Sequence, residues 1–149
     1  MGEKDTMPQD DFDLDRFVNA QRQDYQRALA EIRGGRKRSH WMWYIFPQLD
    51  GLGRSSTARF YGVKGIGEAK AYLAHPILGP RLKESMEAAL AVEGRSAEEI
   101  FGFPDVLKFR SCATLFSSVP GADPVFEQIL QKYYDGKPDE ETIRLLDAP

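Results

Sequence analysis

Apolar side chains recur at intervals of three and four residues along the first long segment of this chain. The pattern runs from Leu14 to Ile32 and forms one apolar stripe on a helix of about five turns. Asp13 precedes the stripe as a plausible N-cap, and Gly34 and Gly35 follow it, where glycine commonly ends a helix. The sequence therefore predicts a long amphipathic helix with one buried face.

Every later segment with a regular pattern also has a period near 3.6 residues, and no alternating, strand-like run occurs. Glycine and proline separate these segments at short intervals, and no linker, internal repeat or low-complexity tract divides the chain. Residues 1–11 lack periodic apolar positions and are acidic. The sequence predicts an all-α fold, with a flexible tail at residues 1–11 and one compact domain of seven or eight helices at residues 12–149.

One predicted helix, residues 104–116, is apolar around most of its circumference, which is typical of a buried helix. Lys108, Arg110 and Ser111 lie among its apolar positions. A buried cation is costly unless it has an anionic partner, either a carboxylate or a bound ligand. Asp105 is placed to pair with Lys108 at a spacing of three residues, and side chains reaching out to solvent are the other alternative.

Composition limits the function further. The chain has 149 residues and a net charge of −3, which argues against a dedicated duplex-DNA-binding protein, although a single-stranded nucleic acid stays a distant alternative. One cysteine, Cys112, permits no internal disulfide and no cysteine-based zinc site, and the two histidines have no metal-ligand spacing. We therefore expect no metal and no cofactor. No apolar run spans a bilayer and no signal peptide is visible, so a soluble, cytoplasmic protein is predicted.

The unusual chemistry is concentrated in residues 36–56, which read RKRSHWMWYIFPQLDGLGRSS. Both tryptophans, one histidine, a basic triplet and a Gly-x-Gly loop fall within this stretch. We predict a short helix over residues 40–46, because Pro47 disfavours helical geometry at the residue before it. A strand is the alternative, since the segment is short and rich in aromatic residues.

The loop that follows has features of an anion-binding site. Gly51 and Gly53 allow backbone N–H groups to converge, and Arg54, Ser55 and Ser56 add donors near the start of a helix. The loop lacks the Lys-Ser/Thr ending of a nucleotide-hydrolase phosphate loop, and no strand precedes it. The alternative is an ordinary turn in which a serine caps the next helix.

Other residues of the stretch have functional and structural interpretations. Lys37 could complete an anion pocket, or be one of several solvated charges at a helix end. His40 could transfer a proton as a general acid or base, or be a hydrogen-bonded core residue. Trp41 or Trp43 could stack a planar ring, or pack in the core. Gln48, at the start of the loop, is a further ligand-binding candidate.

Three motifs, KRSHWMWYIFPQLDGLGRSSTARFYG, AKAYLAHPILGPRL and FPDVLKFRSCATLF, resemble those of a family of microbial proteins. The family is catalogued as domain of unknown function 1810, and some members carry a calpastatin-like label. The similarity extends from about Phe12 to Tyr134. The resemblance implies a compact all-helical fold and no established activity, cofactor or catalytic residue.

Two functions fit these observations. The first is a domain that binds or acts on a small anionic, nucleotide-like ligand, with residues 36–56 as one wall. Lys108, Arg110 and Ser111 would then form the opposite wall. The second is a non-catalytic module for protein–protein interaction, which should expose a contiguous apolar patch. The sequence does not indicate an oligomeric state or decide whether the protein is an enzyme.

Overall fold

The computed structural model describes residues 12–148, so the predicted tail at residues 1–11 lies outside the described part of the chain. Nine helices and no sheet form over these residues, which confirms the all-α prediction. The number exceeds the predicted seven or eight, and three of the helices have only four or five residues. The helices are α1 (Asp15–Arg33), α2 (Met42–Ile45), α3 (Ser56–Phe60), α4 (Ile66–Ala74), α5 (Leu78–Ala91), α6 (Ala97–Phe101), α7 (Asp105–Ser117), α8 (Val125–Tyr134) and α9 (Glu140–Asp147).

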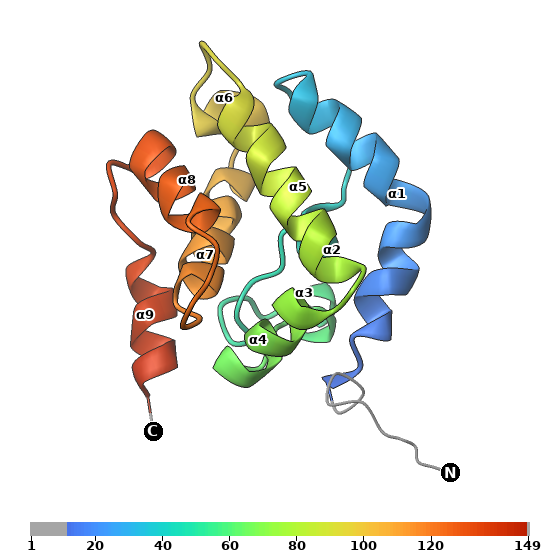
Figure 1. Cartoon of the computed structure of the whole chain (residues 1–149), viewed down its shortest axis with the longest axis vertical. Helices are drawn as coiled ribbons and strands as arrows, with labels where there is room; N and C mark the ends of the chain where they lie inside the picture. The colour runs from blue at the N-terminus through green and yellow to red at the C-terminus, as the bar shows by residue number, and fades with distance from the viewer. Residues whose placement is uncertain (1–11, 149) are drawn as a thin grey trace.

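Helix α7 lies at the centre of the fold. It packs against α2, α4, α6, α8 and α9, and residues 111–116 are all buried. The prediction of a buried helix here is confirmed. Helices α1, α5 and α8 run side by side in front of this centre (Figure 1), because the apolar stripe of each faces the core. The aromatic residues Phe46, Phe109, Phe116 and Phe126 fill much of the interior.

The start of α1 differs from the prediction. Asp13 does not cap the helix: its backbone is left-handed, with φ of +53°, and Leu14 occupies the N-cap position without a side-chain cap. The carbonyl groups of Phe12 and Asp13 instead accept hydrogen bonds from the Arg16 guanidinium, at 2.6 and 2.8 Å. The predicted end of the helix is confirmed, since Gly35 has φ of +78°.

The short helix after the basic triplet is also shorter than predicted. Residues 40–46 contain only the four-residue helix α2, which ends before Phe46 and Pro47. Ser39 provides no cap, because its hydroxyl and backbone N–H both donate to the Glu31 carboxylate, at 2.6 and 3.0 Å. The helical interpretation of this segment is therefore confirmed, and the strand alternative is wrong.

The loop from Gln48 to Gly53 is joined to the loop that follows α3. The Asp50 N–H donates to the carbonyl of Val63 at 2.7 Å, and the Val63 N–H donates to the carbonyl of Gln48 at 2.9 Å. The two backbones approach so closely that a Cβ on Gly62 would lie 2.6 Å from the Asp50 carboxylate. Only glycine fits there, and the pairing holds the backbone at Gln48, whose side-chain amide donates to the carbonyl of Phe46 at 3.3 Å.

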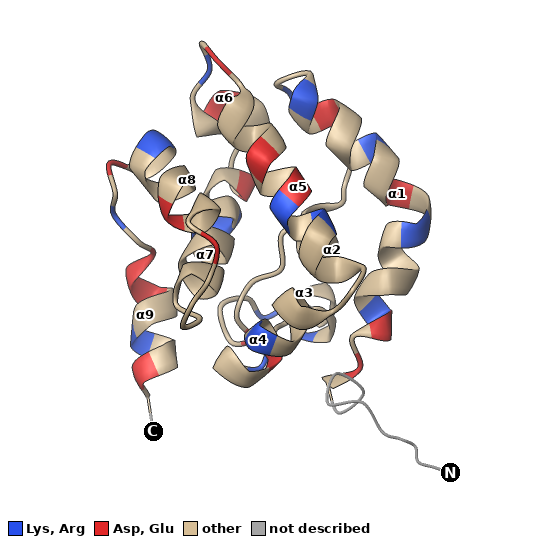
Figure 2. Ribbon diagram, viewed as in Figure 1, with Lys and Arg blue, Asp and Glu red and all other residues tan. Residues whose placement is uncertain are grey.

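Charges of both signs alternate along the outer helices, as α1 and α9 show clearly in Figure 2. This distribution is typical of solvated helix faces rather than of one strongly charged field. Between residues 12 and 148, no helix combines the length and the hydropathy that crossing a bilayer requires.

Candidate functional site

The two segments expected to form opposite walls of a site are in contact. Helix α2, from the aromatic segment, packs against the first half of α7. The Lys108 ammonium lies over the Trp43 ring, 4.0 Å from its centroid. An ammonium this close to an indole is attracted by the negative face of the ring, so the contact positions both side chains.

Asp105 links the two walls through its charge. Its carboxylate pairs with Lys37 at 2.8 Å and with Lys108 at 3.3 Å, which confirms the predicted pairing within α7. Lys37 also lies over the Trp41 ring, 5.0 Å from the centroid. Because Lys37 is almost fully enclosed, the carboxylate supplies the partner that a buried cation requires. Lys37 is thus part of the wall rather than of the pocket lining.

A hollow of about 300 Å³ opens beside this contact and is called here the Trp43 pocket. Trp43, Leu52, Pro104 and Leu107 give it apolar walls, and several polar groups are set into them. Among the predicted site residues, Trp43, Gln48, Lys108 and Ser111 all line it. The remaining lining residues are Gly53, Asp139 and Glu141.

A second hollow, of about 570 Å³, is called here the basic hollow. Three cations line it, Arg54 and the unpredicted Arg59 and Lys64. Within residues 12–148, no ion pair holds any of these three side chains. Asp50 adds one carboxylate, and Gly51 and Gly53 complete the lining. The local charge is therefore positive, although the whole chain is acidic.

Gly53 lines both hollows, and its position admits no side chain. A Cβ there would lie 2.8 Å from the Ala58 Cβ and 3.9 Å from the Trp43 ring. Glycine thus lets α3, which carries Arg59, approach the loop next to Trp43. The two hollows are adjacent because of this close approach.

Substituting Gly53→Ala is expected to lower the free energy of unfolding by about 1–3 kcal/mol, because the added methyl group overpacks the contact with Ala58. Urea denaturation followed by circular dichroism measures this. Gly67→Ala is the matched control: its Cβ would meet only the Phe12 ring, at 3.6 Å, in a helix that favours alanine. We expect that control to be neutral or slightly stabilising, and equal destabilisation by both changes would contradict the steric argument.

Two residues predicted to bind ligand lie elsewhere. Trp41 is fully buried, and its indole N–H donates to Glu31 at 2.8 Å, so it is a core residue and no stacking platform. Arg110 turns away from the Trp43 pocket. Its guanidinium lies over the Tyr134 ring and donates to the carbonyl of Lys137 at 2.9 Å. Trp41 thus takes the alternative of packing in the core, and Arg110 lines neither the Trp43 pocket nor the basic hollow.

The serines and the histidine are not brought into either hollow. The Ser55 hydroxyl accepts the Ala58 N–H at 3.0 Å and caps α3, as in the alternative of an ordinary turn. Ser56 is the exposed first residue of that helix. His40 is exposed, and it lines neither the Trp43 pocket nor the basic hollow. The geometry therefore gives no support to a catalytic role for His40.

Two potential nucleophiles of α7, Ser111 and Cys112, are both buried. The Ser111 hydroxyl donates to the carbonyl of Leu107 at 3.1 Å. Burial raises the pKa of the Cys112 thiol well above its usual range, which makes that thiol unreactive. No cluster of three or more histidine, cysteine, aspartate or glutamate side chains that could hold a metal ion occurs in residues 12–148.

Residues 11–146 match the family described as "Protein of unknown function (DUF1810)". The chain belongs to the DUF1810 family. This agrees with the resemblance carried by the three sequence motifs. A similar solved structure is the crystal structure of the conserved hypothetical protein Rv1873 from Mycobacterium tuberculosis, at 51% sequence identity. That match covers 93% of this chain and 99% of the mycobacterial chain, with a TM-score of 0.91, so the two folds are the same. No curated protein matches the chain.

Several lining residues of this DUF1810 protein could not have been found from the sequence. Leu52 and Leu107 are ordinary apolar positions, and Asp139 and Glu141 come from the far end of the chain. The sequence indicates Arg59 and Lys64 only weakly as site residues, through their position within a dozen residues after the Gly-x-Gly loop. Their convergence with Arg54 depends on the bridge between the loops on either side of α3.

Proposed function

We propose that this protein binds a small anionic ligand that carries a planar ring, such as a nucleoside monophosphate. The ring enters the Trp43 pocket and the phosphate lies in the basic hollow. The observation that carries the proposal is the position of Gly53, which lines both hollows and makes them neighbours. A ligand with its ring and its charge a few bonds apart fits this arrangement.

The Trp43 pocket has the size and lining that a nucleobase needs. Its volume of about 300 Å³ is at the lower end for small-molecule sites. Apolar side chains, Trp43 and Leu107 among them, suit the faces of a flat ring. The Gln48 amide suits the ring edge, because a glutamine side chain can both donate and accept hydrogen bonds there.

The basic hollow supplies the attraction for the anion. Arg54, Arg59 and Lys64 present three positive charges against the single carboxylate of Asp50. Arginine recognises phosphate well, because its planar fork can donate two parallel hydrogen bonds. We expect the affinity to fall as the salt concentration rises, because Arg54, Arg59 and Lys64 are all exposed and salt screens charges that lie in solvent.

Isothermal titration calorimetry with the four nucleoside 5′-monophosphates tests the proposal. We expect at least one to bind, and Trp43→Leu and Arg54→Gln each to raise its Kd about tenfold, through lost stacking and lost charge respectively. Arg36→Gln is the matched control, because Arg36 is exposed and lines neither hollow. The free nucleoside should bind more weakly than its phosphate. Failure of all four nucleotides to bind at millimolar concentration would refute the proposal.

One observation favours the alternative of a protein-interaction module. Phe103, just before α7, and Leu107, in its first turn, are 73% and 49% exposed. Leu107 also lines the Trp43 pocket, so a partner's side chain could enter there. This alternative predicts that Phe103→Ser changes association with a protein partner and leaves nucleotide binding unaltered. The polar lining and the adjacent cations are better suited to a small anion.

A further inference from the structure

We propose that the basic hollow leads to a second ring-binding subsite at Phe60, so that the ligand is a dinucleotide, with two rings joined through phosphate groups. The inference rests on the proposed function and names the ligand class for the same site. A third hollow, of about 540 Å³, is called here the Phe60 hollow. Its lining residues are Phe12, Asp13, Arg16, Arg59, Phe60 and Lys64.

The three hollows follow one another across the surface. The Trp43 pocket and the basic hollow share Gly53, and the basic hollow and the Phe60 hollow share Arg59 and Lys64. An aromatic ring therefore lies at each end of the series, with cations between them. This order matches a ligand in which a ring, a phosphate group and a second ring follow in turn.

Phe60 has the properties of a stacking platform. Its side chain is 55% exposed, although it is large and apolar. The Tyr61 ring supports it edge to face, with centroids 4.8 Å apart, and Tyr61 in turn packs against Tyr44 at 5.3 Å. An exposed aromatic ring that is held from behind and flanked by cations is the usual arrangement for stacking a nucleobase.

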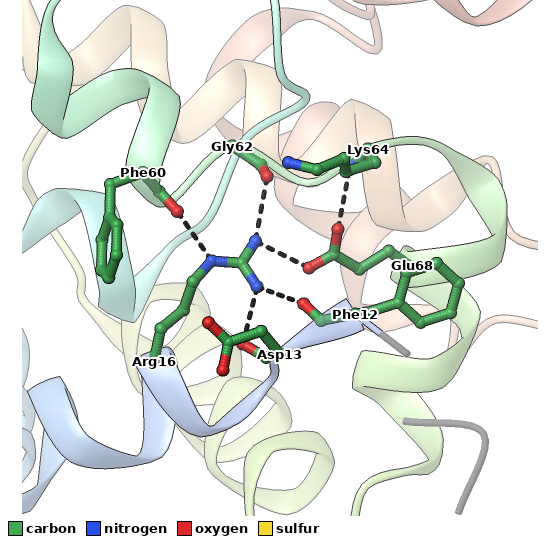
Figure 3. Close-up of polar contacts among 7 residues, drawn as sticks. All are labelled: Phe12, Asp13, Arg16, Phe60, Gly62, Lys64 and Glu68. Carbon is green, nitrogen blue, oxygen red and sulfur yellow. Dashed lines mark hydrogen bonds and ion pairs between the residues drawn. The ribbon is translucent and has the colours of Figure 1, made fainter. Parts of the chain in front are cut away.

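The backbone that carries this subsite is fixed by a buried ion pair (Figure 3). The Arg16 guanidinium donates to the carbonyl of Phe60 at 2.7 Å and to that of Gly62 at 3.0 Å. It also pairs with Glu68 at 2.7 Å, and the other Glu68 oxygen accepts the Lys64 N–H at 2.9 Å. The segment from Phe60 to Lys64 is thus held in place before any ligand arrives, which lowers the entropy cost of binding.

The charges around the subsite agree with this ligand. Glu68 neutralises Arg16, so Arg59 and Lys64 provide the positive charge at the junction of the two hollows. Asp50 and Asp13 each add one carboxylate, in the basic hollow and the Phe60 hollow respectively. Carboxylates next to phosphate sites commonly accept hydrogen bonds from ribose hydroxyls.

Calorimetry with adenosine monophosphate and with diadenosine diphosphate, in which pyrophosphate joins two adenosines, tests the inference. We expect the dinucleotide to bind about tenfold more tightly, because the second ring adds a stacking contact. Phe60→Ser should abolish this gain and leave the affinity for the mononucleotide unchanged. Ile77→Ser is the matched control, because Ile77 is also an exposed apolar residue and lies outside all three hollows.

The outcomes separate the two proposals. Equal affinity for both ligands, unaffected by Phe60→Ser, would overturn the second subsite and leave the mononucleotide site standing. Absence of binding by either ligand would overturn the dinucleotide, and failure of the other three nucleoside monophosphates as well would overturn both proposals. Tighter binding of a short single-stranded oligoadenylate than of diadenosine diphosphate would overturn the dinucleotide in favour of a nucleic-acid strand.

Discussion

Replacing Arg16 with methionine is expected to lower the free energy of unfolding by about 3–5 kcal/mol, since removal of one partner leaves a buried charge uncompensated. Arg16 and Glu68 are both buried, and the guanidinium donates five hydrogen bonds. The substitution would leave Glu68 with only the Lys64 N–H and would strip the donor from the carbonyl of Phe60. Urea denaturation at pH 7, followed by circular dichroism, measures the change.

The same substitution at Arg27 is the control. Arg27 also lies on α1 and pairs with a carboxylate, that of Asp24 at 3.6 Å, but its side chain is largely exposed. An exposed pair contributes little, so we expect Arg27→Met to change stability by less than about 0.5 kcal/mol. Similar effects from Arg16→Met and Arg27→Met would show that burial does not set the strength of the Arg16 interaction.

Arg16→Lys separates charge from geometry. A lysine keeps the positive charge beside Glu68 but cannot supply the planar fork that reaches four backbone carbonyls at once. We expect this variant to recover only part of the lost stability. Because the same contacts hold the segment from Phe60 to Lys64, both substitutions at Arg16 should also weaken binding at the Phe60 hollow.

The sequence predicts the helices but not this ion pair. Helix α1 and helix α7 are visible because their apolar positions repeat with the period of a helix, which is a local property. Arg16 is an ordinary charge between Leu14 and Phe17, and Glu68 lies 52 residues away on another helix. Nothing local marks the two as partners, because their contact exists only after α1 and α4 pack together.

The candidate site, too, is predictable only where its residues carry a local sequence signal. Five site residues stand out in the sequence, because they are polar or aromatic and lie next to helix-breaking residues or inside an apolar helix. The structure places all five in two adjacent hollows: Trp43, Gln48, Arg54, Lys108 and Ser111. The apolar walls of these hollows carry no such signal. The sequence also could not separate the two tryptophans, because their roles depend on a helix that starts at Met42 rather than at His40.

Glu31 determines how Trp41 and the segment before α2 are held. Its carboxylate accepts four hydrogen bonds, from the Ser39 hydroxyl, the Trp41 indole and the N–H groups of Arg38 and Ser39. Burial on its own would raise the pKa of Glu31, but the hydrogen bonds outweigh that effect and lower the pKa from 4.5 to about 2. The folded protein thus binds this proton more weakly than the unfolded chain does.

The lowered pKa predicts a specific dependence of stability on pH. Above about pH 5 the carboxylate is ionised in both states, and its hydrogen bonds contribute fully. As the pH falls from 5 towards 2, the unfolded chain takes up the proton first, and the contribution is lost. Because the side chain is partly exposed, solvent screening reduces the effect, and we expect Glu31→Gln to destabilise the protein by about 2 kcal/mol at pH 7.

The difference between wild type and Glu31→Gln should therefore shrink as the pH is lowered and should be small at pH 2, where Glu31 is almost fully protonated in the unfolded chain and about half protonated in the folded protein. Urea titrations at pH 7, 5, 3.5 and 2 measure it, and Glu93→Gln, at an exposed glutamate, is the control that should show no such trend. A difference that stays constant with pH would mean that the glutamine acts through packing rather than through the lost charge. Since Glu31 fixes the chain that leads into α2, the variant should also weaken ligand binding in the Trp43 pocket at pH 7.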